Sequence, residues 1–149
     1  MSDVFLAPGF SGHINYETGD IYPGYRDQLE DIIDALYDVG RFSVYCSVQE
    51  NDWKASTNQD TDRIKADMNE IKLAPTFLYL PSKNGISETA SAQTGIAIGM
   101  AKKVIVATRQ DRALGNTFKA LSDLGIINHV SFKDPEELAL EVKWISENN

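Results

Sequence analysis

Short apolar runs and longer segments with a helical period alternate along the chain. Runs rich in β-branched and aromatic residues predict strands at residues 4–6, 42–46, 76–80, 104–107 and 129–132. Strands that alternate with amphipathic helices are typical of a parallel sheet with helices on both faces. We therefore predict one α/β domain over residues 1–149, a doubly wound, flavodoxin/Rossmann-like fold with a five-stranded parallel sheet and residues 76–80 as its central strand.

The segments between the predicted strands repeat apolar residues every three to four positions. Leu29 and Leu36 belong to one such stripe, and Gly40 follows it as a helix stop. At the end of the chain, Asp134 and Pro135 have the types expected for a helix cap and a first helical residue. The predicted helices span residues 25–39, 60–73, 88–102, 116–124 and 135–146.

A doubly wound sheet places its ligand site beyond the carboxyl ends of the strands. The segments that reach this edge are 7–12, 47–57, 81–91 and 108–117. In the first, Gly9 permits close backbone approach, and Phe10 or Tyr16, a few residues beyond this segment, could stack on a planar ring. In the second, Trp53 could form a wall for a base. A simple turn with incidental aromatic packing is the alternative for these residues.

Charge argues against a nucleic-acid polymer as partner. The chain has a formal net charge of −8 and a sequence pI near 4.7. Proteins that bind the phosphate backbone depend on clustered Lys and Arg. A small-molecule ligand is therefore expected.

The cysteine content and the apolar runs bear on location. Cys46 is the only cysteine, so no internal disulfide can form, and no Cys/His cluster suggests a zinc site. The N-terminus lacks the features of an export signal, and no run of about 18 apolar residues occurs. We expect a cytoplasmic protein without a membrane span.

Asp67 occupies an unusual position for a carboxylate. It lies three residues after Ile64 and four before Ile71, on or beside the stripe that these residues form with Met68. A buried carboxylate without a partner is costly, so Asp67 should face a cavity or a hydrogen-bonding group.

Polar residues also mark the predicted helix 88–102, whose small residues Ala90, Ala97 and Ala101 suit close packing on the sheet. Gln93 lies between Ala90 and Ala97, so it should follow the sheet-facing stripe and need a ligand or a buried partner. Ser87 precedes this helix, and Glu88 begins it. The two could bind an anion or hydroxyl groups, or simply cap the helix.

Several segments resemble the nucleoside 2-deoxyribosyltransferase superfamily, which includes related nucleotide N-glycoside hydrolases. VFLAPGF looks like a permuted form of the family's L-A-G-P-F, and IKADMNEIKLAPTFLYL carries an aspartate ahead of the third strand. SAQTGIAIGMAKKVIV is similar to T-A-x-E-I-G-Y-A-L-A-L-G-K-P-V-I without a gap. The resemblance covers nearly the whole chain and implies the same fold.

The resemblance also implies a reaction and a set of roles. The reaction is N-glycosidic bond cleavage or 2-deoxyribosyl transfer on (deoxy)nucleosides or their monophosphates, through a glycosyl-enzyme intermediate and with neither metal nor organic cofactor. Asp67 would contact the base or assist proton transfer, position 93 would face C1′, and Ser87 and Glu88 would bind sugar hydroxyls or phosphate. Asn116 would reach a neighbouring subunit's site, so a homo-oligomer with shared sites is implied.

One position departs from the family pattern in a way that bears on activity. Gln93 stands where the family has its nucleophilic glutamate, and a neutral amide is a poor substitute for a carboxylate. Three explanations remain open: a natural member that binds without turnover, a site that uses Glu88 instead, or an introduced Glu-to-Gln change. A non-catalytic nucleoside or nucleotide sensor on the same fold is the alternative function.

Overall fold

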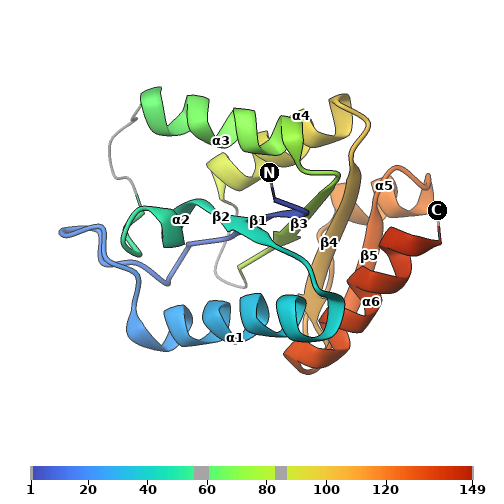
Figure 1. Cartoon of the computed structure of the whole chain (residues 1–149), viewed down its shortest axis with the longest axis horizontal. Helices are drawn as coiled ribbons and strands as arrows, with labels where there is room; N and C mark the ends of the chain where they lie inside the picture. The colour runs from blue at the N-terminus through green and yellow to red at the C-terminus, as the bar shows by residue number, and fades with distance from the viewer. Residues whose placement is uncertain (1, 56–60, 83–86, 149) are drawn as a thin grey trace.

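The computed structural model describes residues 2–55, 61–82 and 87–148, and its centre is one parallel sheet (Figure 1). Five strands pair in the order β2-β1-β3-β4-β5, all parallel. This confirms the predicted five-stranded sheet and its central third strand. The strands are β1 (Val4–Pro8), β2 (Val44–Cys46), β3 (Thr76–Leu80), β4 (Lys103–Arg109) and β5 (Asn128–Phe132).

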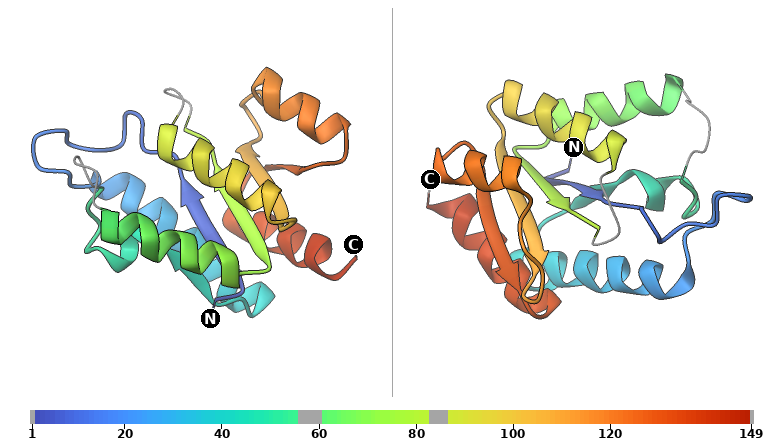
Figure 2. Two further views of the ribbon diagram at one scale, coloured as in Figure 1. Left: turned by 90° about the horizontal axis from the view of Figure 1, so that it is seen from above. Right: turned by 180° about the vertical axis from the view of Figure 1, so that it is seen from behind.

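Helices cover both faces of the sheet, as predicted (Figures 1 and 2). On one face lie α1 (Pro23–Gly40) and α6 (Pro135–Glu147); on the other lie α3 (Thr61–Leu73), α4 (Glu88–Gly99) and α5 (Asn116–Asp123). The short α2 (Ser47–Glu50) follows β2 where the sequence suggested only a loop. None of the helices in the described segments is long and apolar enough to cross a membrane.

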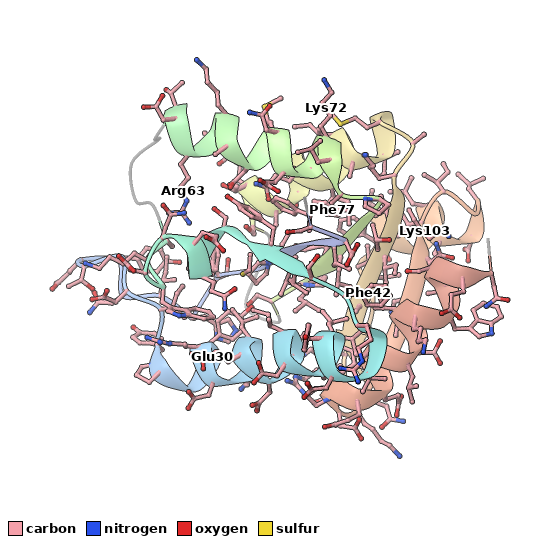
Figure 3. The ribbon with its side chains drawn as sticks, viewed as in Figure 1. Glu30, Phe42, Arg63, Lys72, Phe77 and Lys103 are labelled. Atoms are coloured by element: carbon pink, nitrogen blue, oxygen red, sulfur yellow. The ribbon has the colours of Figure 1, made fainter. Side chains whose placement is uncertain are left out.

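A row of three aromatic rings crosses the sheet beneath α3 and α4. The Phe5 and Phe77 rings stack with centroids 5.4 Å apart, and the Tyr45 ring stacks on Phe5 at 5.5 Å. Phe77 comes from the central strand and is only 1% exposed, and Figure 3 shows it inside the fold. The row fixes the position of Tyr45 on the edge strand β2.

Two predicted helix ends need correction. Gly40 is still helical, and the left-handed residue that ends α1 is Arg41, with a φ of 58°. Gly40 has another role, because a Cβ there would lie 2.4 Å from the Phe42 ring. The α4 helix stops at Gly99 rather than residue 102, and Ala101, with a φ of 57°, is exposed instead of joining the sheet-facing stripe.

The apolar stripe predicted for α3 is only partly right. Ile71 is buried, but Ile64 and Met68 are 43% and 40% exposed. Asp67 is the other buried residue of this helix. The helix is therefore rotated so that a carboxylate, rather than Ile64 and Met68, faces the protein interior. The predicted first residue of this helix, at position 60, lies outside the described residues.

Candidate functional site

The loops that follow β1 and β3 are in close contact at the carboxyl edge of the sheet. The Gly9 amide donates to the Leu80 carbonyl at 2.8 Å, and the Ser82 hydroxyl donates to the Ser11 carbonyl at 2.7 Å. A Cβ on Gly9 would lie 2.6 Å from the Ser82 backbone nitrogen. Glycine is therefore required at position 9, as the predicted close approach implied.

Two of the predicted site residues meet between α3 and α4. Asp67, 5% exposed, accepts a hydrogen bond on Oδ2 from Gln93 Nε2 at 3.3 Å. Its Oδ1 accepts a hydrogen bond from the Tyr45 hydroxyl at 3.1 Å. We call these three residues the Asp67 cluster. Asp67 thus has the polar partners that its position in the sequence required.

Tyr45 was missed by the sequence analysis. Its partner lies 22 residues further along the chain, so no local pattern connects the two. The available signal was the period of the strand, because Tyr45 must point to the face opposite Val44 and Cys46. That face is the one covered by α3 and α4.

Arg63 links α3 to the residues that follow β2. Its Nε donates to the Ser47 hydroxyl at 3.1 Å, and its Nη1 donates to the Lys54 carbonyl at 2.9 Å. Figure 3 shows Arg63 pointing from α3 toward α2. The guanidinium therefore adds positive charge on the side of Asp67 that faces α2.

Burial dominates the electrostatics of the Asp67 cluster. Burial raises the pKa of Asp67, while hydrogen bonds from Ser47 and Tyr45, the Arg63 charge and the Gln93 amide oppose that rise without cancelling it. Burial, followed by the neighbouring Asp67 carboxylate, raises the pKa of Tyr45 to about 12. Tyr45 therefore stays protonated and remains a donor. No group of three His, Cys, Asp or Glu side chains suited to a metal ion occurs among the described residues.

The raised pKa of Asp67 predicts a pH-dependent stability. An acid whose pKa is raised by folding stabilises the folded state fully below its unfolded pKa, and this contribution is lost as pH rises through the folded pKa. Asp67→Asn removes the titrating group. Its unfolding free energy, measured by urea denaturation, should therefore improve relative to the wild type as pH rises from about 4 toward neutrality. The exposed Asp38→Asn is the control, and a pH-independent difference for Asp67→Asn would contradict the assignment.

The sheet-facing stripe of α4 contains Ala90 and Ala97, as predicted, but not Gln93. Its buried residues are Ala90, Thr94 and Ala97, and the Thr94 hydroxyl donates to the Ala90 carbonyl at 2.7 Å. Gln93 is half-buried and contacts Asp67 of α3. The expectation that Gln93 follows the sheet-facing stripe is corrected, because Thr94 takes that place.

The start of α4 supports the capping explanation for Ser87. The Ser87 hydroxyl accepts a hydrogen bond from the Ala90 amide at 3.3 Å, so it caps the helix. Glu88 lies exposed in the first turn, with no hydrogen bond or ion pair to any described residue. Residues 83–86, between β3 and this cap, lie outside the described residues.

The aromatic residues proposed to contact a base lie apart from the Asp67 cluster. Phe10 and Trp53 pack against the apolar cluster on the α1 face of the sheet, whereas Tyr45 packs against the cluster on the other face. The Arg26 guanidinium lies 5.0 Å from the centroid of the Trp53 ring. Tyr16 is 69% exposed. Phe10 and Trp53 therefore pack on the opposite face of the sheet from Tyr45.

A pocket of about 770 Å³ lies between α4 and α5, and we call it the α4–α5 pocket. Asn116 lines it from the start of α5, opposite Ser91 and Thr94 of α4. Burial raises the pKa of Tyr79, another lining residue, while a hydrogen bond with Ser91 opposes the rise. Gln93 faces α3, so within one chain Asn116 and Gln93 lie on different sides of α4.

Comparisons with known proteins gave matches only at the level of structure. No family model matches the chain, and no curated protein sequence matches it. The structure of BlsM is 20% identical, covers 99% of this chain and 94% of that chain, and has a TM-score of 0.74.

Two further matches have activities in their names. The CMP N-glycosidase BcmB of Clostridium botulinum is 17% identical over 93% of this chain and 96% of its own, with a TM-score of 0.58. A 2-deoxyribosyltransferase of Bacillus psychrosaccharolyticus is 17% identical over 91% and 89%, with a TM-score of 0.61. At such identities the likeness shows the fold, and the fold is the one that the sequence resemblance implied.

Proposed function

We propose that this chain, which has the fold of the nucleoside 2-deoxyribosyltransferase superfamily, binds (deoxy)nucleosides or their monophosphates and acts on the N-glycosidic bond. The observation that carries the proposal is the Asp67 cluster. It holds a buried carboxylate of raised pKa against residue 93, the position that resembles the family's nucleophile. Perturbed carboxylates beside a reactive position are typical of functional sites.

In the mechanism of the resembled family, a carboxylate at the position that Gln93 occupies here attacks C1′ of the sugar. The C1′–N bond breaks, the base leaves with the bonding electron pair and takes up a proton, and a glycosyl-enzyme ester forms. Water or a second base then attacks C1′ and releases the carboxylate. Asp67, whose pKa is raised, suits proton transfer to the departing base. Ser87 and Glu88 contact the sugar or phosphate, and Asn116 comes from a neighbouring subunit.

Gln93 places a neutral side chain, rather than a second acid, beside Asp67. Its amide donates to Asp67 at 3.3 Å, so the buried carboxylate has a neutral partner. Glutamate in the same place would put two acids within hydrogen-bonding distance, and such pairs share a proton. With glutamine at position 93 the proposed pair lacks its nucleophile, so slow turnover is expected.

A non-catalytic nucleoside or nucleotide sensor is the second candidate. The observation that favours it is the same hydrogen bond, because Gln93 is satisfied by Asp67 and supplies no anion to C1′. A sensor needs only a site that binds the ligand and does not need to displace the base from C1′. The two candidates therefore predict the same ligands and differ only in turnover.

Incubation with a panel of nucleosides and nucleoside monophosphates tests the proposal. Free base is measured by chromatography, and binding is measured in parallel by thermal shift, since ligand at about 100 times its dissociation constant adds roughly 2.7 kcal/mol of stability. We expect stabilisation by at least one nucleoside-type ligand, with slow base release for an enzyme and none for a sensor. Absence of both binding and base release over the whole panel would refute both candidates.

A further inference from the structure

Arg112 lies where two cavities meet at the carboxyl edge of the sheet. It lines the α4–α5 pocket and also a smaller cavity of about 140 Å³, which we call the α1 cavity, beside α1 and the ends of β3 and β4. Pro81 and Ser82 line both cavities as well. A group bound at Arg112 could therefore be reached from either side of the sheet edge.

The Arg112 guanidinium has an unmet hydrogen-bonding requirement. Its Nε is buried and has no partner among the described residues. The backbone around it is ordered by a hydrogen bond from the Arg112 amide to the Arg109 carbonyl at 2.9 Å. Leaving a buried donor unpaired is costly, and a native structure that does so needs a reason. A hydrogen-bond acceptor on a bound ligand would pair with this donor and explain why it is left unpaired here.

The charge around Arg112 is opposite to that of the chain. The whole sequence has a net charge of −8, yet the described residues that line the two cavities include Arg109 and Arg112 and no Asp or Glu. Arg109 is held at the rim, with Nη2 donating to Gln28 Oε1 at 3.4 Å and the guanidinium 5.3 Å from the Phe132 ring centroid. A cavity that collects cations and excludes carboxylates in an acidic protein favours an anionic ligand.

We propose that Arg112 binds the phosphate or carboxylate group of a small molecule that occupies the α4–α5 pocket, with Arg109 adding positive charge from the adjoining α1 cavity. The planar guanidinium offers paired donors that match either oxyanion. Thr108 also lines this pocket, and its hydroxyl lies 2.8 Å from His129 Nε2. This inference does not depend on residue 93 or on glycosidic chemistry.

Calorimetric titrations of the full chain with inorganic phosphate and with acetate, at low ionic strength, test the proposal. We expect saturable binding of at least one anion. The anion that binds more tightly shows whether the site prefers a phosphate or a carboxylate group. Arg112→Gln should weaken it at least about tenfold, as loss of a charge-assisted hydrogen bond predicts. Lys119→Gln removes one exposed charge from α5 outside both cavity linings and should leave the affinity unchanged.

Arg112→Met separates a binding role from a structural one. Because the variant removes an unpaired buried donor, its thermal midpoint without ligand should equal or exceed that of the wild type. A marked fall in the midpoint would show that Arg112 is structural and would overturn the proposal. Equal anion affinity in wild type and Arg112→Gln, or no saturable binding of either anion to the wild type, would overturn it too. Since neither probe is a nucleoside, these outcomes leave the proposed function untouched.

Discussion

Gln93→Glu is expected to raise base release or base exchange by at least about 100-fold, the lower range for a positioned catalytic side chain. The wild-type amide cannot provide the anion that attacks C1′, whereas a carboxylate at the same place can. The gain should appear in kcat more than in ligand affinity, because the new interaction forms mainly in the transition state. Initial rates across a substrate series, followed by chromatography of the free base, measure it.

The same substitution should reduce stability at neutral pH. Gln93 donates to Asp67 at 3.3 Å, and an ionised glutamate would replace that donor with a second negative charge. The paired acids would then share one proton, which raises the apparent pKa of the pair. In Gln93→Glu with Asp67→Asn, an amide again faces a carboxylate, so the stability lost in the single variant should be recovered.

Glu88 supplies the control for this experiment. It lies exposed in the first turn of α4, five positions before Gln93. Glu88→Ala should abolish residual wild-type turnover only if Glu88 has taken over as the nucleophile. Robust wild-type activity that Gln93→Ala does not change would show that residue 93 is not the reacting position.

Phe77→Ala is expected to lower the unfolding free energy by about 3–5 kcal/mol, the usual cost of emptying the space of a large aromatic side chain. Phe77 is 1% exposed in the central strand and stacks on Phe5 at 5.4 Å. Denaturant unfolding followed by circular dichroism measures the change. Leu124→Ala, at a side chain 72% exposed, should cost no more than about 0.5 kcal/mol.

Phe77→Ala also tests whether the row of aromatic rings supports the Asp67 cluster. Phe5 lies between Phe77 and Tyr45, and the Tyr45 hydroxyl donates to Asp67 at 3.1 Å. A cavity at position 77 should loosen that row and weaken binding of any ligand at the cluster. Equal losses of stability in Phe77→Ala and Leu124→Ala would contradict the packing assignment.

Local signals predicted the elements whose determinants are close in sequence. The strand β3 has the predicted bounds, and the Asp134 side chain accepts a hydrogen bond from the Glu137 amide at 2.8 Å as a helix cap. The helical spacing of Asp67 was sufficient to predict that this carboxylate needs a partner. In each case the deciding residues lie within a few positions of one another.

Long-range packing decided what the sequence did not show. Which face α3 turns inward depends on Tyr45 and Gln93, 22 and 26 residues away from Asp67, and they outweigh the apolar character of Ile64 and Met68. Arg112 is unremarkable in sequence, and the burial of its Nε depends on loops that meet only in the folded chain. The sequence therefore indicated that Asp67 needs a polar partner, while Tyr45 and the long-range contacts around Asp67 could not be read from it.

Among the described helices of eight residues or more, α5, which begins with Asn116, is the one without a buried side chain. It is eight residues long, and its Phe118 and Leu121 pack partly against the sheet. Segments with so little buried apolar contact open locally at low free energy while the rest of the fold stays intact. Asn116 therefore lies on a segment that opens at low free energy, and a partner that packs on α5 must offset, with its own binding free energy, the conformational entropy lost when this helix is ordered.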